Sequence, residues 1–138
     1  MGKTLTVTPL FGVLLVGYFL TIGLLHQFYP NLHTLEATIY KFRLPSNAEW
    51  AFKLSDLIIL TGLFVLYIEL FKSTRASNIA ITEHILSIFV FIAYLLIFLY
   101  APVVADSTFV ILGAMSFIDV IAGLTITITA ARKDLSVG

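Results

Sequence analysis

Four long apolar runs constrain this chain more than any other feature of its sequence. Each run holds 18 to 24 residues, and about 20 residues let a helix cross a hydrocarbon layer of roughly 30 Å. The runs are continuous rather than alternating, which indicates helices and not the strands of a membrane barrel. We therefore predict an all-α, integral membrane four-helix bundle, a single domain over residues 1–138 with spans at Leu5–Phe28, Leu54–Phe71, Ile85–Val104 and Thr108–Ala131.

The composition agrees with a membrane protein and excludes several other classes. Of the 138 residues, 59% are hydrophobic and 12% are charged, whereas soluble domains carry roughly 25% charged residues. Eight basic residues balance eight acidic ones, so the chain lacks the positive field that holds nucleic acid. It has no cysteine, which excludes disulfides and cysteine-ligated metals. We expect the chain to lie in a lipid bilayer and to bind no nucleic acid.

Basic residues near the span ends predict the orientation, because lysine and arginine resist translocation. With four spans, the two termini and the loop between the second and third spans lie on the same side. That side holds five basic residues against three on the other, so we expect both termini in the cytoplasm. The five are Lys3, Lys72, Arg75, Arg132 and Lys133, and the three are Lys41, Arg43 and Lys53.

The first loop contains a weaker periodic pattern between the first two spans. Leu32, Leu35, Ile39 and Phe42 recur at spacings of three, four and three, which predicts a short interfacial helix over residues 31–44. A partly ordered loop is the alternative. The sequence Ser46–Glu49 resembles a capping box, so we expect the next helix to begin near Asn47.

Asp119 is the first candidate for a functional residue, because it falls in the middle of the fourth run. A carboxylate at that depth costs on the order of 3 kcal/mol. Aligning the spans by their centres brings it level with Tyr94, Thr61 and Tyr18, and with no lysine, arginine or histidine. We expect a protonated Asp119 hydrogen-bonded within this intramembrane polar site. It could relay a proton, fix helix packing, or pair with a cation of another subunit.

A stripe of small and polar residues surrounds Asp119 on the same helix face. Ser116, Asp119, Gly123 and Thr127 follow one another at spacings of three, four and four, a pattern that lets a neighbouring backbone approach closely. The stripe predicts a helix contact within the chain or with another one. Gly17 and Thr21 form a shorter stripe of the same kind on the first span.

A cluster of charged residues is predicted at the cytoplasmic ends of the second and third spans. Glu69 and Lys72 are spaced to pair along one helix, and Glu83 suits the start of the next. Solvated end charges are one interpretation, and a docking surface for a partner or a lipid head group is the other. The cluster consists of Glu69, Lys72, Arg75, Glu83 and His84.

Motifs of enzymes are missing from the sequence. There is no glycine-rich phosphate loop, no G-x-S-x-G and no H-E-x-x-H. His26 and His84 fall at opposite ends of their spans and cannot ligate one haem, and Pro30 separates His26 from His33 and Glu36. We expect no catalytic residue, no metal and no cofactor.

The second half of the chain resembles a family of small four-span proteins of proteobacterial inner membranes. The resemblance lies in the segment from Glu69 to the tail, above all in Phe117–Gly123, in the threonines at 125, 127 and 129, and in Ala131–Asp134. It implies a bacterial inner membrane and no particular activity. We predict an accessory or assembly subunit of a larger inner-membrane complex. The alternative is a small oligomeric proton-linked transporter that uses Asp119.

Overall fold

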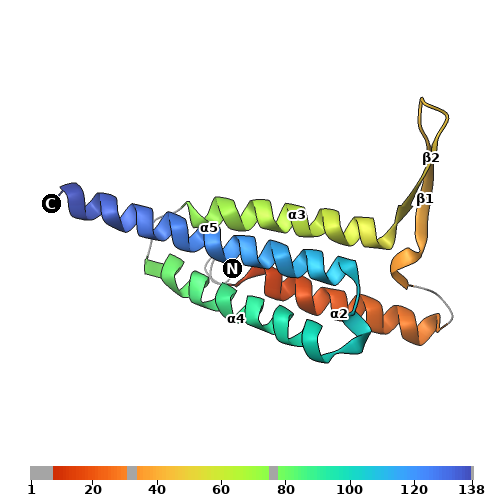
Figure 1. The fold of residues 1–138 in the computed structure, drawn as a ribbon, viewed down its shortest axis with the longest axis horizontal. Coiled ribbons are helices and arrows are strands. Elements are labelled where there is room, and N and C mark those ends of the chain that lie inside the picture. Colours follow the sequence, from red (N-terminus) through yellow and green to blue (C-terminus); the bar gives the residue numbers. More distant parts are fainter. Residues whose placement is uncertain (1–7, 31–33, 75–77, 138) are drawn as a thin grey trace.

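The computed structural model describes residues 8–30, 34–74 and 78–137. For residues 78–80 it describes the backbone only. Four long helices run alternately up and down, and α5 lies between α3 and α4 along much of its length (Figure 1). The helices are α2 (Leu10–Phe28), α3 (Leu54–Ser73), α4 (Asn78–Tyr100) and α5 (Ser107–Val137). This arrangement confirms the predicted helical bundle.

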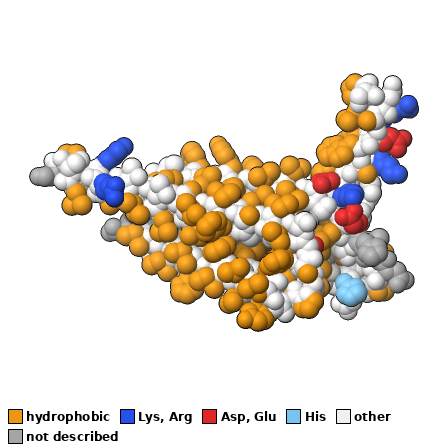
Figure 2. All heavy atoms as spheres, viewed as in Figure 1, with side chains coloured by type: hydrophobic (Ala, Val, Ile, Leu, Met, Phe, Trp, Pro, Cys, Tyr) orange, Lys and Arg blue, Asp and Glu red, His pale blue; other side chains and the backbone are white. Residues whose placement is uncertain are grey.

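All four helices are long and apolar enough to cross a membrane. Figure 2 shows an apolar middle, with basic side chains near both ends and the visible acidic ones near the end that carries the hairpin. A 20-residue helix such as α3 is about 30 Å long, which matches a hydrocarbon layer. The prediction of a multi-pass membrane protein is therefore confirmed at the level of four spanning helices.

The helix ends differ from the predicted spans in an informative way. α4 ends at Tyr100, two residues before Pro102, which opens the short 3-10 helix η2 (Pro102–Val104). Proline lacks the amide that the helix needs and disfavours helical backbone in the residue before it. α5 continues for 31 residues to Val137, beyond the predicted end at Ala131. The centres of the third and fourth spans are therefore not at the same depth.

The core is apolar and aromatic in the half of the bundle nearest η2. The rings of Tyr18 and Tyr94 each lie 5.3 Å from that of Phe109, centroid to centroid. Gly62 of α3 faces Leu112 and Met115 of α5, where a β-carbon would come within 3 Å of both side chains. Small residues thus allow α3 to approach α5 closely, as packing in membranes requires.

The predicted interfacial helix over residues 31–44 is wrong for the part of it that the structure describes. A 3-10 turn, η1 (Thr34–Glu36), leads into a hairpin of β1 (Thr38–Arg43) and β2 (Glu49–Lys53). Aromatic residues alternate along both strands, a period of two that suits a strand better than the weaker helical period. Residues 31–33, which include Leu32, lie outside the described part of the chain.

The capping box predicted at Ser46–Glu49 is a turn instead. Asn47 has a φ of 63°, in the left-handed region that asparagine tolerates, and its amide donates to the Leu44 carbonyl at 2.9 Å. Helix α3 begins later, at Leu54, where the Asp56 carboxylate accepts from the Lys53 amide at 2.9 Å. Pro45 and Asn47 favour a tight hairpin over a helix start.

Candidate functional site: a buried polar cluster

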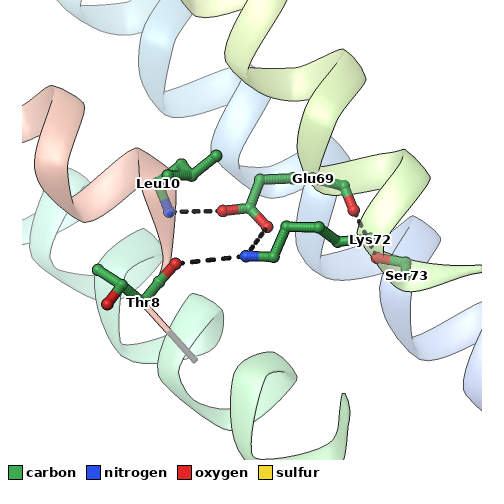
Figure 3. A network of polar contacts seen from close by, with 5 residues as sticks. All are labelled: Thr8, Leu10, Glu69, Lys72 and Ser73. Atoms are coloured by element: carbon green, nitrogen blue, oxygen red, sulfur yellow. Dashed lines mark hydrogen bonds and ion pairs between the residues drawn. The ribbon is translucent and has the colours of Figure 1, made fainter. Parts of the chain in front are cut away.

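The Glu69 side chain joins two helices in the bundle (Figure 3). One carboxylate oxygen accepts from the Leu10 amide at the start of α2, and the other pairs with Lys72 at 3.1 Å. Pro9, which precedes α2, supplies no side-chain cap. The first amides of a helix need acceptors and carry a partial positive charge. Glu69 therefore caps α2 from a different helix.

Lys72 completes this connection. Its ammonium group also donates to the Thr8 carbonyl at 3.3 Å, and the Ser73 hydroxyl donates to the Glu69 carbonyl at 3.0 Å. The side chain of Glu69 is 7% exposed and that of Lys72 is 17% exposed. The expected Glu69–Lys72 pair is thus present, and it is largely buried rather than solvated, with Lys72 half-buried. Arg75, predicted in the same cluster, lies outside the described residues.

Asp119 joins the polar residues near this end of the bundle. Its carboxyl group is buried on α5, has the Ser87 hydroxyl of α4 as its hydrogen-bonding neighbour, and interacts electrostatically with Glu69, Lys72 and Glu83. Among the described residues Asp119 forms no ion pair, although Lys72 contributes to its electrostatic surroundings. We call Glu69, Lys72, Glu83, His84, Ser87, Ser116 and Asp119 the polar cluster.

The residues expected to surround Asp119 are bonded elsewhere. Tyr94 donates to the Phe11 carbonyl at 3.1 Å, and Tyr18 donates to the Asp106 carboxylate at 2.7 Å. Thr61 is exposed and donates to the Leu57 carbonyl of its own helix. The predicted intramembrane site of Asp119, Tyr94, Thr61 and Tyr18 is therefore not assembled.

The reason is a difference in depth. Tyr94 of α4 packs opposite Gly113 of α5, where a β-carbon would lie 3.8 Å from that of Tyr94. Asp119 is six residues further along α5, about 9 Å at 1.5 Å per residue. Counting both helices from the corner at η2 would have paired Asp119 with Ser87, whereas aligning the centres of the apolar runs did not.

The small-residue stripe forms the buried side of α5. Ser116, Asp119 and Gly123 are buried and Thr127 is half-buried. The His84 ring lies directly over Gly123, so close that a β-carbon there would come within 2.5 Å of two ring atoms. Glycine at this position therefore makes room for the histidine, in the manner of small residues at membrane helix contacts.

Two buried atoms of the polar cluster have no hydrogen-bond partner among the described residues. They are Nε2 of His84 and the hydroxyl oxygen of Ser116. Buried polar atoms of this kind are uncommon, because each costs about 1 to 3 kcal/mol. Together with the Glu69–Lys72 pair and the buried Asp119 carboxyl group, they make the cluster a place that can hold a proton.

Polar contacts at the other end of the bundle centre on Asp106. Asp106 caps α5 by accepting from the Phe109 amide at 2.9 Å while it also accepts from Tyr18. A cavity of about 420 Å³ lies beside this contact and includes His26 and Glu36 in its lining. Within the described residues, no group of histidine and acidic side chains is arranged to hold a metal ion.

Comparisons with known proteins found no relative of this chain. No family model, curated protein or solved structure matches the chain.

Proposed function

We propose that this protein is a non-enzymatic, multi-pass membrane protein that serves as an accessory or assembly subunit of a larger complex in a bacterial inner membrane. The observation that carries the proposal is a shallow groove of about 440 Å³ on the outer face of α2. We call it the α2 groove, and its lining includes Pro9, Gly12, Val13, Val16, Gly17 and Leu20.

The α2 groove is suited to a helix of another polypeptide. A β-carbon at Gly17 would meet nothing within 4 Å, and Gly17 is exposed, so the rest of the described chain does not cover it. Thr21 satisfies its hydroxyl by donating to the Gly17 carbonyl at 2.8 Å. Helices associate in lipid where small residues let the backbones come together, since lipid removes the usual hydrophobic driving force.

The interior of the bundle supports a structural role. Glu69 caps α2, Tyr94 binds the Phe11 carbonyl, and Tyr18 binds Asp106, so three of the buried polar groups hold helices together. Between the polar cluster and Asp106, the core is filled by apolar side chains such as Phe109 and Leu112, each at most 1% exposed. This packing favours a rigid body over a pathway for a substrate.

A pair of glycine variants tests the proposal. Gly17→Leu adds bulk in the α2 groove and Gly23→Leu adds the same bulk on α2 outside the groove, at two positions where a β-carbon would meet nothing within 4 Å. We expect a membrane protein, or a second copy of this chain, to co-purify with the wild type and with Gly23→Leu in mild detergent, and to be lost from Gly17→Leu. A wild-type chain that is only a stable monomer would overturn the proposal.

The orientation is part of the same proposal. We infer that both termini and the loop between α3 and α4 are cytoplasmic, on the support of the five basic residues that this side carries against three. Reporter fusions after Val137 and within the loop of Pro45–Asn47 should give opposite localisation. Equal localisation of the two reporters would contradict this topology.

The polar cluster favours a second candidate, an oligomeric proton-linked transporter. Glu69 pairs with Lys72, the acids Asp119 and Glu83 interact electrostatically with both, and the cluster also contains the unpartnered Nε2 of His84. In this function, Asp119 would gain and lose the transported proton. Proton flux into liposomes that contain the purified protein should then fall sharply in Asp119→Asn, and flux unchanged by this substitution would exclude it.

A further inference from the structure

The hairpin of β1 and β2 is built as a platform at one end of the bundle. Figure 1 shows that it runs across the long axis of the bundle rather than along it. β2 passes into α3 without a linker, because Lys53 ends the strand and Leu54 begins the helix. The hairpin therefore starts at the level where the α3 span starts.

Several contacts hold the base of this platform. The Leu54 amide donates to the Ala37 carbonyl at 3.0 Å, and the Lys53 amide donates to Asp56. The Lys53 side chain pairs with Glu36, and this hydrogen bond and the Glu36 charge raise the pKa of Lys53 above its ordinary value. These bonds tie the direction of the hairpin to the first turn of α3.

The two faces of the hairpin have opposite chemistry. Tyr40 pairs with Phe52 across the strands, and Phe42 pairs with Trp50, so four rings share one face. Successive ring centroids along this face lie 4.8, 5.6 and 5.6 Å apart. The intervening residues of the other face include the charged Lys41, Arg43 and Glu49.

The aromatic face is uncovered and turned toward the apolar part of the molecule. Tyr40, Phe42 and Trp50 are 62%, 43% and 48% exposed. Figure 2 shows hydrophobic side chains along the side of the hairpin that faces the apolar belt of the bundle, and charged side chains along the opposite side. An isolated two-stranded hairpin is marginally stable in water, so this face needs a covering surface.

We propose that the hairpin lies flat in the membrane interface, with the aromatic face among the lipid head groups and upper acyl chains and the charged face in water. Tyrosine and tryptophan concentrate at this depth because their rings are apolar and their edges are polar. The hairpin ends where the α3 span begins, and it runs across the axis of the bundle. Its aromatic face therefore meets the bilayer that α3 enters.

The tryptophan of the hairpin makes the proposal directly measurable, because Trp50 is the only tryptophan in the chain. With the full protein in phosphatidylcholine vesicles, we expect Trp50 emission to be blue-shifted from that of free tryptophan amide and shielded from iodide. Lipids brominated near the head group should quench it more than lipids brominated near the chain end. Emission and iodide quenching equal to those of the free amide would overturn the proposal.

Paired variants on the two faces separate this position from other coverings. The chain has no cysteine, so Lys41→Cys and Phe42→Cys place single thiols on adjacent residues that face opposite ways. In vesicles, a membrane-impermeant maleimide should label Lys41→Cys several-fold faster than Phe42→Cys. This difference in labelling rate should persist when the protein is held without detergent in fragments of bilayer at a high lipid-to-protein ratio.

Two outcomes would contradict the inference while leaving the α2 groove proposal untouched. Equal labelling of the two thiols would show that the hairpin does not lie between lipid and water. Shielding of Trp50 that disappears as the lipid-to-protein ratio rises would assign the aromatic face to a second copy of the chain. Lys41→Ser serves as the matched control and should leave Trp50 emission unchanged, whereas Tyr40→Ser should shift it to the red.

Discussion

The two ends of the bundle each contain a lysine–glutamate pair, and the pairs do different work. The Glu69–Lys72 pair is largely buried between α2 and α3, and Glu69 supplies the acceptor for the first amide of α2. The Lys53–Glu36 pair is exposed, with 39% and 66% of the side chains accessible, and it ties only a local segment to the start of α3. The comparison teaches that burial, and not the presence of an ion pair, decides how much of the fold depends on it.

The largest expected effect is at Glu69. Glu69→Leu removes the cap of α2 and leaves Lys72 buried without its carboxylate, which should lower the free energy of unfolding by about 3 kcal/mol. Glu69→Gln keeps an acceptor for Leu10 and should cost about 1 kcal/mol. Equilibrium unfolding in mixed micelles, followed by circular dichroism, measures both.

A double variant supplies the control for Glu69. Glu69→Leu combined with Lys72→Leu removes both charges, so part of the loss should be recovered. If Glu69→Leu were as stable as the wild type, the contrast between the two ends of the bundle would fail.

The next effect is expected where α4 crosses α5. Gly123→Ala forces a β-carbon into the His84 ring and should cost about 1 to 3 kcal/mol, as overpacking does. At the contact of α3 with α5, Gly62→Ala meets the flexible ends of Leu112 and Met115, so it should cost less than Gly123→Ala. Gly17→Ala meets nothing and should stabilise α2 by up to about 1 kcal/mol. Adding His84→Ala should relieve Gly123→Ala, and a lack of relief would show that the ring is not the obstacle.

A smaller effect is expected at the start of α5. Asp106→Ala removes the acceptor of the Phe109 amide and of the Tyr18 hydroxyl, and the lost cap should cost about 1 kcal/mol. Tyr18→Phe removes only the second of these bonds and should cost less than Asp106→Ala. The same unfolding measurement ranks the two, and equal costs would mean that the bond between helices, and not the cap, accounts for the loss in Asp106→Ala.

The smallest effect is expected at the exposed pair. Glu36→Gln should leave the unfolding midpoint within its measurement error, because solvent and salt screen a pair of this kind. A loss as large as that of Glu69→Gln would show that the base of the hairpin supports the whole bundle, and the contrast between the ends would then disappear.

The sequence by itself determined that the chain forms four membrane-spanning helices, because the length and apolarity of a span are local properties. It also indicated that α5 presents a small-residue stripe. The sequence pattern does not separate the hairpin from a helix, because the same segment carries four apolar residues at helical spacing and an aromatic alternation of period two over both strands.

Only the tertiary structure decided which polar residues meet. Glu69 and Leu10 are 59 positions apart, and no pattern in the chain links a carboxylate on α3 to the first amide of α2. Asp119 meets Ser87 rather than Tyr94, because Pro102 ends α4 early and shifts the level of every pair along α4 and α5. Relative depth depends on where helices end and how closely they pack, and hydropathy averaged over a run contains neither quantity.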